Sequence, residues 1–480
     1  MERTWKNILI CFIGGILFHY LFYGKGIGIS YPLYVLYLYL IFYIKVPSKG
    51  KKQTVFDLLL FLSACLLAAR FTLSSHIILL LLNFAIVPIL LFIHMIHSRR
   101  WEMEKWSNRL FIKSMFLTFF DTLQQFFKLF HFGGQFGKGV MHDKNYQIAK
   151  KIVIGFVLSI PLLWTIIYLL MSSDQQFKSL LSLFPIWLQQ ANIGSILFQA
   201  FIIGFITLWL FAYFITLAKP LVMNQDPIES QAVKMDVVIV STILSMLNIV
   251  YFLYTAVQFS YFFSGDPSSG SLGYTYAEYA RRGFSELTIV SLINLGLLFL
   301  FTHGSHFQKV MLPKVMKLLL SVLVVFTFVM LSSAFYRLSL YEQAYGYTYS
   351  RVYAHAFMIL LFFILVLAMF KVVKGRFKLL RAMFIVTLVA YVTLNYLNID
   401  QLIVSQNMNR YEVTGKLDIN YLSTLSYDAI PALLEQDHEE FRSFLKEKAV
   451  EVNQGPNEWQ SFNFSKAKAK RLLDEWGERK

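Results

Sequence analysis

The sequence predicts an all-α protein, a polytopic bundle of about 11 membrane-spanning helices followed by a small helical C-terminal domain outside the cytoplasm. Three observations lead to this prediction. Hydrophobic residues make up 57% of the 480 residues and charged residues only 15%, whereas soluble domains carry roughly 25% charged residues. The apolar residues gather in runs about as long as a bilayer is thick. The basic residues between these runs alternate from side to side.

Each apolar run is taken as a helix because a span needs roughly 20 residues and lipid tolerates no unpaired backbone. The first run resembles a secretory signal, but no small-x-small cleavage site follows it before Lys25, so we interpret it as an uncleaved span. The third run is short and ends at Arg70, which either snorkels to the headgroups or ends a shallow hairpin with the fourth run. The expected spans are 7–24, 28–46, 55–71, 76–96, 151–171, 193–217, 236–262, 285–302, 316–335, 352–370 and 382–397.

These spans divide the chain into four expected regions. They are a four-span region over 1–96, a basic cytoplasmic loop over 97–150, a seven-span core over 151–397 and a helical tail over 398–480. Within the loop, residues 109–132 alternate polar and Phe-rich faces at helical spacing, which predicts an amphipathic helix in the membrane interface. Its role is either an elbow that supports the fifth span or a lipid-sensing or partner-docking helix. The polar face holds Ser114, Thr118, Asp121, Gln125 and Lys128.

The charge distribution predicts the orientation. One set of loops carries 26 Lys and Arg residues and the opposite set carries seven. The positive-inside rule places the basic set and the N-terminus in the cytoplasm of a plasma-membrane protein, and an odd number of spans then places the tail outside. The membrane part has a net charge of +19 and the tail −3. The basic excess therefore indicates contact with anionic lipid headgroups, and no nucleic-acid partner is expected.

The tail is expected to contain several short helices. An apolar pattern follows Asp418, a second helix is predicted over about 438–450, and a third over about 464–476. Pro431 limits how far the first of these helices runs. About 80 residues give only a marginal core, so we expect the tail to pack on the membrane domain or on an envelope partner.

Polar side chains gather where the spans meet the outer surface. A charge at membrane depth costs at least about 2.5 kcal/mol unless it is paired, so such residues mark a function or an ion pair. Two interpretations remain open: an outward-facing polar pocket, or internal salt bridges that join helix ends. The candidate residues are Asp174, Arg282, Glu286, Arg337, Tyr341, Glu342 and Asp400.

No motif indicates catalysis, a cofactor or a metal. Cys11 and Cys65 both lie in apolar runs, and His303 and His306 have neither a carboxylate nor a cysteine near them in the sequence. We therefore expect no catalytic residue, no metal ligand and no cofactor.

Several motifs resemble a bacterial family of polytopic membrane proteins known only as a domain of unknown function, of the 4173 type. The resemblance covers roughly residues 150–480 and implies no activity, substrate or catalytic residue. The motifs that carry it are Tyr279-Ala-Arg-Arg-Gly-Phe-Ser-Glu-Leu287, Ser333-Ala-Phe-Tyr-Arg337, Tyr341-Glu342, Tyr345-Gly-Tyr-Thr348, Asn398-Ile-Asp400, Asp418-Ile-Asn-Tyr-Leu422, Leu425-Ser-Tyr-Asp-Ala-Ile-Pro431 and Trp459-Gln-Ser-Phe-Asn463.

The sequence thus favours a non-catalytic sensor or adaptor of the cell envelope, with an outward polar pocket and a partner bound through residues 398–480. One alternative is a transporter or channel for a small polar or anionic solute, with Arg282 and Arg337 as its anion contacts. Another is a membrane enzyme that acts on lipid-linked substrates and uses Asp174, Glu286 or Glu342.

Overall fold

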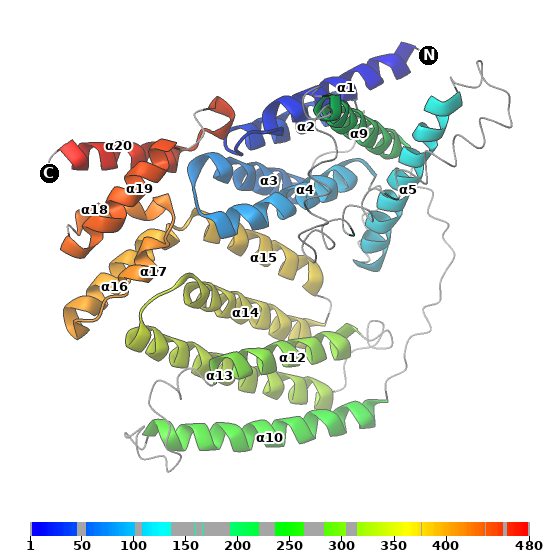
Figure 1. The fold of residues 1–480 in the computed structure, drawn as a ribbon. Coiled ribbons are helices and arrows are strands. Elements are labelled where there is room, and N and C mark those ends of the chain that lie inside the picture. The colour runs from blue at the N-terminus through cyan, green and yellow to red at the C-terminus, as the bar shows by residue number, and fades with distance from the viewer. Residues whose placement is uncertain are drawn as a thin grey trace. The chain divides into compact units, whose positions relative to one another are not determined.

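The computed structural model describes residues 2–45, 54–100, 108–135, 159, 166, 193–219, 236–263, 283–303, 314–375, 377–436, 438–454 and 458–478. Across this part of the chain the fold is all-α, as predicted. Before the tail the helices are α1 Glu2–Phe22, α2 Ser30–Lys45, α3 Val55–Leu73, α4 Ile77–Arg100, α5 Asn108–Gln135, α9 Ile193–Ala218, α10 Val237–Phe263, α12 Phe284–His303, α13 Lys314–Tyr345, α14 Tyr349–Lys374 and α15 Leu379–Tyr396 (Figure 1).

Ten of the eleven expected spans coincide with these helices, and the fifth, 151–171, falls almost wholly outside the described residues. Eight helices of the described part are long and apolar enough to cross a membrane, namely α3, α4, α9, α10, α12, α13, α14 and α15. The apolar part of α1, Asn7–Phe22, is shorter, and α2 has 16 residues. The chain is therefore a multi-pass membrane protein.

The tail contains α16 Ile399–Thr414, α17 Ile419–Ser423, α18 Ile430–Glu435, α19 Arg442–Gln454 and α20 Phe464–Glu478. Local sequence sets these boundaries. The side chain of Asn398 accepts a hydrogen bond from the Gln401 amide and so caps α16, and Asp418 caps α17 in the same way. Pro431 lies in the first turn of α18, where its missing N–H costs nothing. The predicted second and third tail helices correspond to α19 and α20.

The chain divides into two compact units whose boundaries differ from the four expected regions. The first comprises Met1–Ala69, Ile86–Val222 and Pro456–Phe462, and the second Arg70–Ala85, Met223–Gly455 and Asn463–Lys480. In the first unit α1 packs closely on α9. A Cβ atom at Gly15 would lie 2.5 Å from the carbonyl oxygen of Ile203, so only glycine permits this approach of two helices.

The predicted amphipathic helix is confirmed as α5, which packs on α9 in the first unit. The ring of Phe126 lies 5.3 Å from that of Phe205, measured between centroids. Ser114 and Thr118, expected on the polar face, are buried, whereas Phe119 and Phe127 are exposed. The Thr118 hydroxyl donates to the Ser114 carbonyl one turn earlier, so these two small residues can be buried without another polar partner. That these rings lie among acyl chains stays a prediction.

The second unit has two hydrophobic cores. One joins α10, α12, α13 and α14 around Leu320, Leu323, Ala334 and Leu361, and α13 contacts all three of the other helices. The other joins the tail helices around Ile403, Leu433 and Phe441. This tail core also includes Leu79 of α4 and residues of α14 such as Val352. The tail therefore packs against membrane-spanning helices of its own chain.

A tight turn joins α13 to α14 and is held by α16. Gly346 has φ +85°, and a Cβ atom there would lie 2.5 Å from Oδ1 of Asn407. The Asn407 side chain accepts a hydrogen bond from the Tyr347 amide and donates one to the Tyr347 carbonyl, both 2.9 Å long. Arg410 donates to the carbonyls of Gln343 and Ala344. The last carbonyls of α13 are thus capped from the tail.

Candidate functional site

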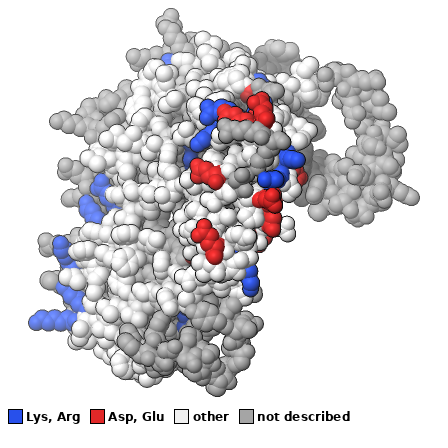
Figure 2. Space-filling model, turned by 90° about the vertical axis from the view of Figure 1, so that its left-hand side faces the viewer, with Lys and Arg blue, Asp and Glu red and all other residues white. Residues whose placement is uncertain are grey.

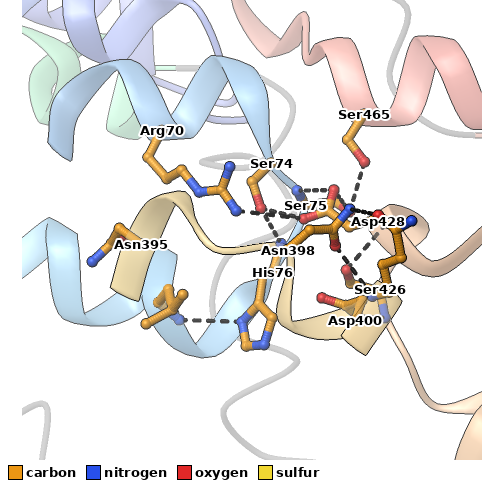
Figure 3. A network of polar contacts seen from close by, with 12 residues as sticks. Arg70, Ser74, Ser75, His76, Asn395, Asn398, Asp400, Ser426, Asp428 and Ser465 are labelled. Atoms are coloured by element: carbon orange, nitrogen blue, oxygen red, sulfur yellow. Dashed lines mark hydrogen bonds and ion pairs between the residues drawn. The ribbon is translucent and has the colours of Figure 1, made fainter. Parts of the chain in front are cut away.

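The most connected group of buried and half-buried polar side chains among the described residues lies where the tail meets the turn between α3 and α4. We call this group the tail junction. It consists of Arg70, Ser74, Ser75, His76, Asp400, Ser426, Asp428, Asn463 and Ser465, all in the second unit, and Figure 3 shows all of them except Asn463 as labelled sticks.

The turn supplies the first half of the tail junction. His76 is buried at the start of α4, where its Nδ1 accepts a hydrogen bond from the Leu79 amide and so caps the helix. Its Nε2 lies 3.1 Å from the hydroxyl of Tyr353 on α14. Burial lowers the pKa of His76 because the charged imidazolium loses its hydration. The turn is therefore fixed to two spans by a neutral imidazole.

Asp428 brings the tail to this turn. Its carboxylate accepts hydrogen bonds from the Ser74 hydroxyl and, at 3.2 and 3.3 Å, from the amide and hydroxyl of Ser75. Nη2 of Arg70 lies 3.9 Å away, and the Arg70 guanidinium also lies 5.7 Å from the ring centre of Tyr396. Arg70 therefore forms an ion pair with the tail from the last turn of α3 (Figure 3). Because α3 is long and apolar enough to cross a membrane, its length favours a span over a shallow hairpin, and the snorkelling of Arg70 stays a prediction.

Asp400 lies in the first turn of α16 and is almost fully buried. It accepts hydrogen bonds from the Tyr349 hydroxyl and, at 3.0 Å, from the Ser426 amide. Burial raises the pKa of Asp400 because the carboxylate loses its hydration. The side chain thus joins α14, α16 and the segment that carries Asp428.

The last contact of the tail junction comes from the segment before α20. The Asn463 amide group donates to the carbonyls of Phe71 and Ser74 at 2.9 and 2.7 Å, so it caps the end of α3. The Ser465 hydroxyl lies 3.3 Å from that of Ser75. The turn between two spans is therefore held by both the α16–α18 segment and the α20 segment of the tail.

The residues predicted to form one polar pocket have different partners. Glu286 is exposed at the start of α12 and accepts a hydrogen bond from Ser285. Arg337 is buried, with its guanidinium against Gly283, and the guanidinium of Arg351 covers the Tyr341 ring. Glu342 pairs with His355, as described below, and Asp400 belongs to the tail junction. Asp174 and Arg282 lie outside the described residues.

A second polar group joins α13 to α14. Glu342 is 3% exposed, and its two carboxylate oxygens lie 3.2 and 3.1 Å from Nδ1 of His355. Nε2 of the same imidazole lies 3.3 Å from the Ser339 hydroxyl. One nitrogen of the imidazole thus contacts a carboxylate, and the other contacts a hydroxyl and, at 3.4 Å, the Phe335 carbonyl oxygen.

A line of polar side chains runs between α10, α12 and α13. The Tyr251 hydroxyl donates to Asn294 over 2.7 Å, and Asn294 donates to Thr327 over 3.0 Å. Ser333 donates to Gln258 over 3.1 Å. These neutral groups either bind the helices together or line a route for a polar solute.

Sequence analysis missed His355, His76 and Asp428 as site residues. His355 lies in the apolar run 352–370, and an ionisable residue at such a place is itself a signal. Asp428 lies in a motif that we singled out, but its partners are more than 350 positions away in the sequence. Within the described residues, no group of three or more His, Cys, Asp or Glu side chains is arranged to hold a metal ion.

The charged side chains of the tail lie on its surface. On the face drawn in Figure 2 acidic and basic side chains lie close together in one region, and most of the remaining described surface carries no formal charge. Ion pairs on the tail surface, such as Arg442 with Glu439 at 3.8 Å, are well exposed. An exposed pair of this kind adds little stability, so the tail is held mainly by its core and by the tail junction.

Apolar spans joined to a packed helical tail define the class as an all-α, multi-pass integral membrane protein. Residues 61–436 match the model of a family described as a domain of unknown function, DUF4153, and the chain belongs to this family. The prediction of a family of unknown function is confirmed, whereas the number 4173 is not. No curated protein and no solved structure matches the chain. The matched region begins in α3, ends just after α18, and contains both Arg70 and Asp428.

Proposed function

We propose that the protein is an envelope sensor or adaptor of the bacterial plasma membrane. Its tail binds an envelope partner, and the tail junction carries the effect of binding to the spans. The observation that supports this proposal is the placement of Asp400, Asp428 and His76, all at the contact between the tail and the turn of two spans. Basic loops that face anionic cytoplasmic headgroups complete the arrangement.

Buried polar contacts suit this role because their energy depends strongly on geometry. A buried carboxylate that keeps its hydrogen bonds is tolerated, whereas one that loses them costs several kcal/mol. The tail junction therefore favours two discrete states, docked and released, over a range of intermediate ones. A partner that binds one state more tightly shifts the balance between them.

The orientation is tested by cysteine labelling in intact cells. Val413 at the end of α16 is 85% exposed and Val55 at the start of α3 is 86% exposed. We expect a membrane-impermeant maleimide to label Val413→Cys in intact cells and Val55→Cys only after permeabilisation. The parent chain with Cys11 and Cys65 serves as the control. Labelling of Val55→Cys alone in intact cells would reverse the orientation and exclude an envelope partner for the tail.

The partner is tested by photo-crosslinking from the same surface. A photoreactive residue at position 413 should give one defined adduct in native membranes, and the same residue at 55 should not. The adduct should change in yield when Asp428→Asn weakens the tail junction. An adduct whose yield is the same with and without Asp428→Asn would contradict the coupling that we propose.

Transport of a small polar solute is a second candidate, favoured by the polar line between α10, α12 and α13. Asn294 is its central member because it bonds to both neighbouring helices. If the line conducts, Asn294→Leu abolishes solute flux in liposomes while the tail stays docked. If it only joins helices, the substitution lowers thermal stability and no flux exists to be lost.

A further inference from the structure

The group formed by Ser339, His355 and Glu342 has the connectivity of a nucleophile, a base and an orienting carboxylate. The Ser339 hydroxyl lies 3.3 Å from Nε2 of His355, and Glu342 contacts Nδ1 on the other side of the ring. Glu342 is nearly fully buried, His355 is 15% exposed, and Ser339 is half-buried. This is the order required for nucleophilic catalysis, with the carboxylate inside and the hydroxyl nearest the surface.

Nε2 of His355 faces two oxygens, the Ser339 hydroxyl at 3.3 Å and the Phe335 carbonyl at 3.4 Å. Ser339 also lies 3.0 Å from the carbonyl of Phe335, one turn earlier in α13. Rotation about the side-chain bond therefore transfers its hydrogen bond from Phe335 to His355. The carboxylate of Glu342 favours the tautomer with its proton on Nδ1, whereas the Phe335 carbonyl favours a proton on Nε2. His355 therefore accepts the serine proton in the tautomer that Glu342 selects.

The depth of the group in the membrane indicates which bond it would meet. The 32 residues of α13 are about 48 Å long, and the hydrocarbon layer is about 30 Å thick. A centred helix then extends about 9 Å beyond the hydrocarbon at each end. Ser339 lies six residues, or about 9 Å, before the end of α13 at Tyr345. In such a centred helix Ser339 lies at the hydrocarbon boundary, next to the ester carbonyls of the lipids.

A cation lies one helical turn above the group, toward the headgroups. Arg351 precedes His355 by four residues on α14, so the two side chains share a face. Its Nη1 is held by the carbonyl oxygens of Tyr345 and Gly346, and its guanidinium lies 4.3 Å from the Tyr341 ring centre. Its Nε and Nη2 groups carry no hydrogen bond to the described residues. A fixed guanidinium at this height suits a lipid phosphate.

We propose that Ser339 and His355 are catalytic residues that hydrolyse acyl esters of anionic phospholipids in the leaflet next to the tail, with Glu342 as a positioning residue. Ser339 Oγ bonds to the ester carbonyl carbon and gives its proton to His355 Nε2. The carbon–oxygen bond to the glycerol breaks, and the leaving oxygen takes that proton. Water then attacks the acyl-serine, gives one proton to His355, and releases a fatty acid as the serine is restored.

This activity is separate from the proposed sensor role and is tested without it. The competing interpretation is that His355 and Glu342 form an ion pair that only joins α13 to α14. The two interpretations differ in one respect, because an ion pair does not activate a neighbouring hydroxyl. The test therefore measures the reactivity of Ser339 and not the stability of the bundle.

The first experiment treats the full-length protein in lipid nanodiscs with a fluorophosphonate probe and maps the modified residue by peptide mass spectrometry. We expect phosphonylation of Ser339, with loss of fluoride, and a loss of labelling of at least tenfold in Ser339→Ala. Ser332→Ala, a change of an exposed serine on the same helix, serves as the matched control. His355→Gln should lower the labelling rate by about 10²- to 10⁴-fold.

Glu342 is tested by conservative rescue. Glu342→Asp should retain more labelling than Glu342→Gln, although the aspartate changes the shape of the side chain more. A purely structural contact predicts the opposite order. If a variant folds poorly, the residue that the probe labels in the parent protein still decides between the two interpretations. An unlabelled parent protein, or one labelled only at other serines, overturns the proposal.

The substrate class is tested with vesicles of phosphatidylglycerol and of phosphatidylcholine. We expect fatty-acid release at least tenfold faster from phosphatidylglycerol, and Arg351→Gln should remove this preference. Equal release from both vesicles would refute the role of the headgroup charge. No release from either vesicle would refute the hydrolase assignment itself.

Discussion

The tail junction predicts how strongly the tail is held. Asp428→Asn keeps the shape of the side chain but removes its charge and one of its two acceptor oxygens. The hydrogen bond from Ser74 to a carboxylate contributes about 1.5–3 kcal/mol, and the partly buried ion pair with Arg70 adds about 1 kcal/mol. We therefore expect Asp428→Asn to destabilise tail docking by about 2–4 kcal/mol.

Hydrogen exchange measures this loss directly. Tail amides that exchange through release of the tail should exchange about 30- to 700-fold faster, since 1.4 kcal/mol is a factor of ten. The amides of α18 and α20 report on the tail, and those of α13 report on the spans. Glu439→Gln is the matched control because Glu439 is 84% exposed and its partner Arg442 47%. It should change exchange less than about threefold.

A double-mutant cycle separates the ion pair from the rest. Arg70→Gln combined with Asp428→Asn should cost less than the sum of the single changes, by at least about 1 kcal/mol, because the two side chains interact. Additivity within about 0.5 kcal/mol would show that the Arg70–Asp428 contact contributes nothing. An acceleration of tail exchange below threefold in Asp428→Asn would refute the whole argument.

Four further predictions concern the tail and the α13–α14 turn that it holds. Burial raises the pKa of Asp400, so docking should weaken as pH rises from about 3.8 through the raised pKa, and Asp400→Asn should flatten this slope in melting curves. Burial lowers the pKa of His76, so docking should weaken as pH falls from 6.5 through the lowered pKa, and His76→Gln should remove that loss. Gly346→Ala should cost about 1–3 kcal/mol because of its positive φ and the contact with Asn407, measured as faster exchange at the α13–α14 turn. Asn463→Ala removes the donor to the carbonyls of Phe71 in α3 and Ser74 just after it, and should cost about 1–3 kcal/mol, measured by thermal unfolding.

The helices could be predicted from sequence because lipid imposes a length and a composition on each span. Periodicity and turn residues located α5, α19 and α20, but α16, the longest helix of the tail, was not predicted. Sequence patterns could not identify which side chains bind one another. Asp400 was recognised as a polar residue at a helix end, but nothing local indicates that Tyr349 and Ser426 bind it. Hydrogen bonds between distant parts of a chain leave no periodic signal, and the charge pattern that predicted one pocket does not encode them.

The burial of α5 also could not be predicted fully from the sequence. Sequence periodicity correctly separated two faces, but the face with small hydroxyl residues was expected to meet water. It is buried because the hydroxyls of Thr118 and Thr122 donate hydrogen bonds to carbonyls one turn earlier. These side chains then need no other polar partner. Hydropathy alone ranks such residues as polar, so it placed Ser114 and Thr118 on one face with Asp121 and Lys128, which are exposed as expected.

One helix, α16, contacts both the tail junction and the α13–α14 hairpin. α16 holds Asp400 in the tail junction at its first turn, and farther along it caps the end of α13 through Arg410. α16 therefore helps to hold the end of the α13–α14 hairpin that carries Ser339 and His355. If partner binding moves α16, it also changes the distance between the hydroxyl and the imidazole. Because coupling is reciprocal, a lipid bound at the hairpin must in turn change the affinity of the tail for its partner.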